Sequence, residues 1–390
     1  MIYFDNHATT PVDPDVLAAM MPYFQTEFGN AGSITHELGR RAGEAITQAT
    51  LSVARLLGAS SDEIVFTSGA TESNNLALFG HCLHPRQKRG KVVSFTTEHR
   101  AILDPLQRLR SLGFEIVLLP VQNKTSSLPG MIDLDQLSAE LDDNTALVTL
   151  MLANNEIGVI QPIAEVARLC RRFGVTLHTD ATQSVGRMPV DVDDLDVDLL
   201  SFSAHKFYGP KGVGGLYVRS RNRRVVLQPH IVGGGQQNNL RSGTLNSPGI
   251  IGLERALEKS SRLMMTEADH VGAMRNALWQ GLTRELPDLI LNGPRLESSV
   301  RLDGNLNCCF PNVEGQSIMQ LTPQLCASSG SACTSATPHP SHVLTGIGLT
   351  EDQARCSLRF GLGRFNTLQE VETAVSLLSA AYQELRRLGN

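Results

Sequence analysis

The sequence predicts an α/β domain with a mainly parallel sheet, followed by a smaller α+β domain. Between residues 62 and 218, short β-branched runs alternate with amphipathic helical patterns, as in doubly wound folds. The runs are almost continuously apolar, which is typical of parallel strands covered on both faces. After residue 261 the alternation stops. We therefore expect a large domain at 15–260 and a small domain formed by 1–14 and 261–390.

The individual elements follow from their periodicity. An apolar helical stripe between 37 and 57 ends at Gly58, a residue type that commonly terminates helices. Further helices are expected at 163–170, 262–285 and 368–388. The expected strands of the large domain are 63–67, 91–95, 114–119, 145–152 and 175–178.

Composition and charge exclude several classes of protein. The 390 residues are 41% hydrophobic and only 19% charged, which fits a large buried core rather than disorder. The net charge of −5 lacks the basic excess of a nucleic-acid-binding protein, so no direct nucleic-acid partner is expected. The apolar run 146–153 is far shorter than a membrane span, and the N-terminus lacks a signal-peptide pattern. We therefore expect a cytoplasmic protein with no membrane partner.

The cysteines indicate a reducing compartment. There are seven of them, and no two are spaced as C-x-x-C, so neither a disulfide framework nor an intrinsic metal site is expected. Cys82 and Cys170 stand in apolar patterns and are interpreted as packing residues, and the pair Cys308-Cys309 is interpreted as part of a core strand. Cys333 lies among serine, glycine and alanine residues, where a thiol is accessible, and is the best candidate nucleophile.

Polar clusters follow the expected strands of the large domain. In open parallel sheets, ligands bind outside the carboxyl ends of the strands, so these clusters are expected at one rim. They occupy residues 68–74, 97–99, 153–156, 179–183 and 203–206.

Lys206 and Asp180 are the strongest pair of candidates within these clusters. A lysine flanked by small residues can be desolvated and used as a nucleophilic amine, although an ordinary surface lysine is the default interpretation. An acid at position 180 could face a pyridinium nitrogen or merely cap a turn. The stretch 68–71 could bind a phosphate at a helix N-terminus or serve only as a helix cap.

Three further polar residues are weaker candidates when taken alone. His99 could lie against an aromatic cofactor and move protons, or be a structural histidine. Asn155 and Gln183 could hydrogen-bond a phenolic oxygen, or only loop backbone.

Taken together, these stretches resemble a cysteine desulfurase of the class-V aminotransferase family, in the subgroup with a long active-site loop. The resemblance extends in order over essentially the whole chain and is most specific in the lysine block and the cysteine loop. The stretches that carry it are 4–14, 66–75, 152–158, 178–183, 203–212, 240–245, 328–335 and 357–360. It implies an aspartate-aminotransferase-like (fold type I) large domain and a small domain with a mobile cysteine loop at about 322–340.

The resemblance also implies a cofactor, pyridoxal 5′-phosphate, bound to Lys206 as an internal aldimine. Asp180 would pair with the ring nitrogen, His99 would stack on the ring, and Asn155 and Gln183 would address the phenolic oxygen. The residues implied in phosphate binding are Ala70, Thr71, Ser203 and His205, with Thr244 reaching the phosphate of the other subunit of a homodimer.

The implied reaction converts L-cysteine to L-alanine. Lys206, with His99, would remove the α-proton, and Cys333 would attack the substrate sulfur and become a persulfide. Arg359, helped by Asn155, would bind the substrate carboxylate, with Arg364 as the alternative. The sulfur would pass to an acceptor protein, either an iron–sulfur scaffold or another carrier, with Cys333 at most a transient cluster ligand.

Two other activities remain open at this stage. A selenocysteine lyase or a cysteine/cystine β-lyase would share the fold but release its product directly. A non-catalytic scaffold or metal-binding protein would instead use its cysteines and histidines as ligands. The chain also departs from the family pattern: His7 replaces a smaller polar residue, 236–239 lacks an acidic residue, and the ending at Asn390 predicts no C-terminal scaffold-docking extension.

Overall fold

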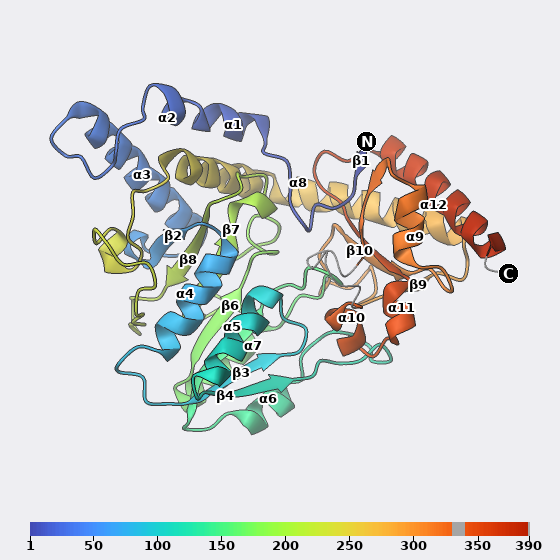
Figure 1. Cartoon of the computed structure of the whole chain (residues 1–390), viewed down its shortest axis with the longest axis horizontal. Coiled ribbons are helices and arrows are strands. Elements are labelled where there is room, and N and C mark those ends of the chain that lie inside the picture. The colour runs from blue at the N-terminus through green and yellow to red at the C-terminus, as the bar shows by residue number, and fades with distance from the viewer. Residues whose placement is uncertain (330–339, 389–390) are drawn as a thin grey trace.

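The computed structural model describes residues 1–329 and 340–388. Its centre is a seven-stranded sheet in the order β2-β8-β7-β6-β5-β3-β4 (Figure 1). The strands are β2 (Ile64–Thr67), β3 (Lys91–Phe95), β4 (Glu115–Leu119), β5 (Thr145–Met151), β6 (Thr176–Asp180), β7 (Leu199–Ser203) and β8 (Gly214–Val218). The predicted α/β class, with a mainly parallel sheet, is confirmed.

Strand β8 is the one that runs against the others in this sheet. It pairs antiparallel with both β2 and β7, whereas the remaining neighbours pair in parallel. Every residue of β5 is buried, which explains why its sequence is a continuous apolar run. At the start of β8, a Cβ on Gly214 would lie 2.7 Å from the Cα of Gly69. The glycine therefore lets the loop after β2 approach the sheet closely.

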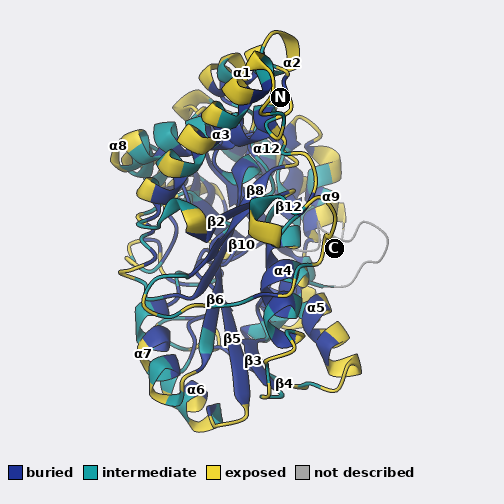
Figure 2. Ribbon diagram, turned by 90° about the vertical axis from the view of Figure 1, so that its left-hand side faces the viewer, coloured by how far each residue is buried: buried dark blue, intermediate teal, exposed yellow. Residues whose placement is uncertain are grey.

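Helices cover both faces of the sheet, and the side chains of β2, β3, β5, β7 and β8 contribute to two apolar cores on opposite faces. One face packs against α4 (Ala70–Cys82) and α5 (Arg100–Ser111). The other packs against α3 (Glu37–Leu56), α7 (Ile163–Phe173) and the first part of α8 (Ser247–Glu285). Figure 2 shows the strands buried between helices whose outward sides are exposed. Shorter helices are α1 (Pro14–Met20), α2 (Pro22–Gln25) and α6 (Leu134–Glu140).

A second, four-stranded antiparallel sheet has the order β12-β13-β10-β9, and β1 pairs in parallel with β11 beside it. A separate apolar core lies among these strands, α9, α12 and the end of α8. These strands are β1 (Ile2–Tyr3), β9 (Ile290–Leu291), β10 (Asn305–Cys309), β11 (Leu325–Cys326), β12 (Ser328–Ser329) and β13 (Ser357–Gly361). The helices of this region are α9 (Gly315–Leu321), α10 (His342–Gly346), α11 (Glu351–Arg355) and α12 (Leu368–Leu388).

Helix α8 joins the two regions (Figure 1). It begins well before the predicted start at 262, because the Asn246 side chain accepts the Gly249 N–H at 3.1 Å and Pro248 occupies the first turn. The sequence Pro248-Gly249 is typical of a turn, which hid this start. The predicted domain boundary at 261 falls inside α8, and the division into two domains stays a prediction.

Several smaller expectations can be compared with the structure directly. Cys82 and Cys170 are buried in apolar cores, and Cys308 and Cys309 are buried in β10, as predicted. In the described ranges, no helix is at once long and apolar enough to cross a lipid bilayer.

The contact between Gly214 and the loop after β2 generates a stability prediction. A Gly214→Ala substitution would place its Cβ 2.5 Å from the Phe202 carbonyl oxygen and 2.7 Å from the Gly69 Cα. Because both are backbone atoms, we expect a loss of about 1–3 kcal/mol in the free energy of unfolding, measured with urea. The matched control is Gly90→Ala, whose Cβ would meet nothing nearer than 3.6 Å. Equal unfolding midpoints for the two variants would contradict the prediction.

Candidate active site

A cavity of about 630 Å³ lies where the polar ends of the parallel strands meet the second sheet. Each polar cluster that follows a predicted strand contributes to its wall, so the structure brings these clusters together as expected. The second sheet contributes Ser328 of β12 and Arg359 of β13, and the N-terminal segment contributes Asp5 and His7. The cavity is therefore built by segments that are far apart in the sequence.

Lys206 stands at the cavity in a single 3-10 turn, η2 (Ala204–Lys206), that directly follows β7. Its Nζ donates to the carbonyl oxygens of His7 and Ala8, each at 2.7 Å. Two carbonyls from the N-terminal segment thus fix the end of the side chain. This is not the ordinary surface lysine of the alternative interpretation.

Asp180 ends β6 and is only 6% exposed. One carboxylate oxygen, Oδ1, accepts the Thr182 N–H at 3.0 Å, which is the turn-capping role considered from the sequence. The other, Oδ2, accepts from Asn74 Nδ2 at 2.8 Å. Asn74 was not predicted as a site residue. It lies one helical turn after Ala70, on the same side of α4, and both residues line the cavity. This four-residue spacing is the signal from which Asn74 could have been predicted.

The N-terminus of α4 forms the anion-binding end of the cavity. Its first N–H groups, which include those of Ala70 and Thr71, have no partner within the helix, and the helix dipole favours an anion there. Ser203 and His205 line the same cavity. Burial, together with the positive charges of Lys206, Lys211 and Arg187, lowers the pKa of His205 to about 4.

His99 caps helix α5 from the cavity wall. Its Nδ1 accepts the Ala101 N–H at 3.0 Å, so the neutral ring carries its proton on Nε2. Burial lowers the pKa of this imidazole, which favours the neutral form. His99 is therefore placed to donate a proton from Nε2.

Asn155 and Gln183 also line the cavity. The Gln183 amide donates from Nε2 to the His7 carbonyl at 2.9 Å, so it anchors the segment that holds the Lys206 amine. The carbonyl of Asn155 accepts from Arg359 Nη1 at 3.1 Å.

The structure distinguishes the two arginine candidates. Arg359 is 5% exposed and lines the cavity, where its Nη2 donates to Asp5 Oδ1 at 2.9 Å. Arg364 is outside the cavity wall, and its Nη1 donates to Asp13 Oδ2 at 2.8 Å. Asp5 was not predicted as a partner of Arg359, because residues so distant in sequence show no pairing signal.

Besides Arg364, two predicted residues are not placed in this cavity. Thr244 is exposed and does not line it. Cys333 lies outside the described residues. The nearest described segments on either side of Cys333 do reach the cavity, since Ser328, Pro340, Ser341 and His342 are part of its wall.

These residues fit pyridoxal 5′-phosphate. The cofactor requires an amine for its aldehyde, a carboxylate for its ring nitrogen and an anion site for its phosphate. Lys206, Asp180 and the start of α4 supply these groups around one cavity. In the part of the chain that the structure describes, there is no group of three or more His, Cys, Asp or Glu side chains arranged to hold a metal ion.

Comparisons with known proteins agree with this chemistry. The family model described as aminotransferase class-V matches residues 2–373. Cysteine desulfurase IscS from Anaeromyxobacter dehalogenans (strain 2CP-C) is 50% identical over 388 residues, which are 99% of this chain and 94% of that relative.

Two solved structures are also similar. A NifS-like protein is 34% identical with a TM-score of 0.90, covering 98% of this chain and 100% of its own. A structure described as SspA in complex with cysteine is 35% identical with a TM-score of 0.79, covering 94% of this chain and 100% of its own.

Glu156 generates a prediction of pH-dependent stability. Burial raises the pKa of this carboxyl to about 7 from an ordinary value of 4.5, against the opposing effects of Ser341 and Arg359. Because the folded-state pKa is the higher one, the stabilisation from the bound proton is complete below pH 4.5 and is lost as the pH rises through 7. As the pH rises over this interval, the free energy of unfolding of a Glu156→Gln variant should increase relative to that of the native protein, by roughly 3 kcal/mol at most.

Urea unfolding of the cofactor-free protein between about pH 5 and pH 8 measures this difference. The control is Glu165→Gln, which alters a half-exposed carboxyl on α7 whose oxygen accepts from Arg168 Nη2 at 3.2 Å. Its stability should follow that of the native protein at every pH. A constant difference between the Glu156→Gln and native proteins across the range would contradict the prediction.

Proposed function

The chain belongs to the aminotransferase class-V family, and from this premise we propose that it is a cysteine desulfurase. Enzymes of this kind use pyridoxal phosphate, and the substrate is L-cysteine, which leaves as L-alanine. The observation that carries the proposal is the meeting of Lys206, Asp180 and the start of α4 around one cavity. The described segments that flank Cys333 complete the wall of this cavity.

Lys206 would hold the cofactor covalently, and Asp180 would pair with its ring nitrogen. Its phosphate would be bound by Ala70, Thr71, Ser203 and His205, and His99 would stack on its ring. Asn155 and Gln183 would hydrogen-bond its phenolic oxygen. When bound, pyridoxal phosphate withdraws electrons from the α-carbon of an amino acid attached to it.

Proton transfer is divided between two side chains. The amine of Lys206, once released, accepts the α-proton of the substrate. His99 cannot accept a proton at Nδ1 while that atom holds the Ala101 N–H, so it acts as the donor through Nε2. Its lowered pKa makes the neutral ring with one transferable proton the prevailing form.

Arg359 binds the substrate carboxylate, since a guanidinium fork suits a planar anion. The Cys333 thiolate then forms an S–S bond with the sulfur of the bound cysteine. The C–S bond breaks, its electron pair remains with carbon, and that carbon takes up a proton. The products are a persulfide on Cys333 and alanine.

The remaining elements of the proposal concern partners. Thr244 is exposed in the single chain, which suits a role at the phosphate of a second subunit in a homodimer. The persulfide sulfur passes to an acceptor protein, an iron–sulfur scaffold or another carrier, in the cytoplasm.

The experiment that tests the proposed function is mass spectrometry after incubation with L-cysteine. We expect the peptide that contains Cys333 to gain one sulfur while alanine is released. Cys333→Ala should retain the bound cofactor but form no persulfide, because the attacking thiolate is gone. Cys326→Ala is the control, since Cys326 is half-buried in β11 and precedes the same segment.

Two results would contradict the proposal. Unchanged alanine release by Cys333→Ala would indicate a lyase that releases its sulfur product directly. Extra sulfur on the peptide of Cys326 in place of that of Cys333 would show that the nucleophile is a different cysteine.

A further inference from the structure

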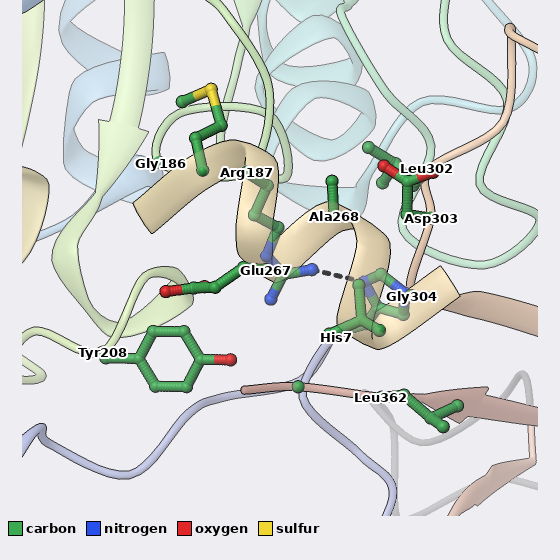
Figure 3. Close-up of a pocket in the computed structure, with 13 residues that line it drawn as sticks. His7, Gly186, Arg187, Tyr208, Glu267, Ala268, Leu302, Asp303, Gly304 and Leu362 are labelled. Carbon is green, nitrogen blue, oxygen red and sulfur yellow. Dashed lines mark hydrogen bonds between the residues drawn. The ribbon is translucent and has the colours of Figure 1, made fainter. Parts of the chain in front are cut away.

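A half-buried arginine, Arg187, bonds to the active-site lysine and has no part in the function proposed above. Arg187 belongs to the turn that follows β6, and it lines a second, small cavity of about 40 Å³ (Figure 3). Its Nε and Nη2 both donate to the carbonyl of Lys206, at 3.1 and 2.9 Å. Nη2 also donates to the carbonyl of Asn6 at 2.5 Å. One guanidinium thus joins the lysine turn to the N-terminal segment.

The other arm of the guanidinium is engaged as well. Nη1 donates to His7 Nδ1 at 2.7 Å (Figure 3). It also donates to Gln183 Oε1 at 3.1 Å. The guanidinium therefore forms five hydrogen bonds, which matches the number of its N–H donors. A lysine has only three donors on one atom and cannot reproduce this fork.

The acceptors around Arg187 are neutral. No carboxylate bonds to it in residues 1–329 and 340–388, although Glu267 lines the same small cavity. A cation that is partly withdrawn from water and lacks a bonded carboxylate costs stability, and well-packed apolar residues often replace such groups without loss. The gain from Arg187 must therefore come from what its hydrogen bonds hold in place.

His7 serves this arrangement as an acceptor. His7 Nδ1 lies 2.7 Å from Arg187 Nη1 and 3.0 Å from Gln183 Oε1. Because Arg187 can only donate, the shorter contact requires an Nδ1 without a proton, and the proton of the neutral ring is then on Nε2. Burial and the charge of Arg187 lower the pKa of His7 well below its ordinary value, which keeps Nδ1 available as an acceptor. His7 therefore has a structural role as an acceptor for Arg187.

The hydrogen bonds of Arg187 and of the Lys206 amine connect Lys206 to the same N-terminal residues from two sides. Arg187 fixes the Lys206 carbonyl relative to the Asn6 carbonyl, and the next two carbonyls, those of His7 and Ala8, receive the Lys206 amine at 2.7 Å. The backbone carbonyl of Lys206, through Arg187, and its side-chain amine are therefore both positioned relative to residues 6–8. A shift of Asn6 away from the turn would also move the two carbonyls that hold the amine.

We propose that Arg187 is a positioning residue. It holds the amine of Lys206 at the place from which the amine attacks the cofactor aldehyde, and the amine returns to this place after substrate has displaced it. The inference rests on the proposed function and deepens it. Arg187 touches neither cofactor nor substrate; it acts through the backbone of Lys206 and of residues 6–8.

The test separates covalent attachment from non-covalent binding of the cofactor. Cofactor-free protein is mixed with pyridoxal phosphate, samples are reduced with borohydride at intervals, and the adduct on the Lys206 peptide is quantified by mass spectrometry. In parallel, calorimetry measures the affinity for pyridoxine 5′-phosphate, which has the same ring and phosphate but no aldehyde. A misplaced amine slows the first process and leaves the second unchanged.

Arg187→Lys keeps the charge and removes the fork. We expect adduct formation at Lys206 to slow by about tenfold or more, because attack is sensitive to small displacements of the reacting atom. The affinity for pyridoxine 5′-phosphate should stay within about twofold of the native value, since Arg187 bonds neither to Asp180 nor to the residues proposed for the phosphate, and Gln183 keeps its own anchor on the His7 carbonyl. The control is Arg275→Lys, which alters a buried arginine of α8 that donates to the Leu296 carbonyl at 3.0 Å and lies outside both cavities.

Two results would overturn the inference: an unchanged rate of adduct formation in Arg187→Lys, or a parallel loss of rate and of pyridoxine 5′-phosphate affinity. If Arg187→Lys does not fold, His7→Ala and His7→Gln replace it. Alanine removes one acceptor and should slow attachment, and glutamine, with its carbonyl oxygen, should restore it. Failure of the proposed function is distinguishable, because the native protein would then form no persulfide on Cys333 whatever the variants show.

Discussion

The amine of Lys206 donates to two backbone carbonyls from the N-terminal segment of the chain, and the rest of the active site is arranged around that contact. The lysine turn follows β7, whereas His7 and Ala8 belong to the N-terminal segment. Carbonyl oxygens of the backbone cannot be changed by substitution, so the contact depends on how the two segments are held together. Gln183 and Arg187 hold them, both from the turn after β6.

The second constraint is that the two sheets must meet at the same cavity. The loops after the strands of the large sheet supply the groups that fit the cofactor, and the second sheet supplies Arg359 and Ser328. The cavity residues that follow Cys333 in the sequence are Pro340, Ser341 and His342. Asp5 pairs with Arg359 and comes from the same N-terminal segment that receives the Lys206 amine. This segment thus connects the candidate substrate clamp with the candidate covalent anchor.

Much of this arrangement could be predicted from local sequence. Apolar runs located the parallel strands, and the rule that ligands bind beyond strand ends located the polar clusters that surround the cavity. Three features could not be found in this way. The Asp5–Arg359 pair and the bonds of Arg187 join residues distant in sequence, and the start of α8 was hidden by Pro248-Gly249. Local sequence patterns predict the secondary structure of a segment, but not the distant segments that it contacts.

The proposed function requires that the Lys206 amine is the covalent anchor of the cofactor. The decisive experiment is to reduce the pyridoxal-phosphate-loaded native protein with borohydride, digest it and sequence the modified peptide. We expect a single pyridoxyl group on Lys206. A group on Lys211, the other lysine of the cavity wall, or no covalent group at all would contradict it.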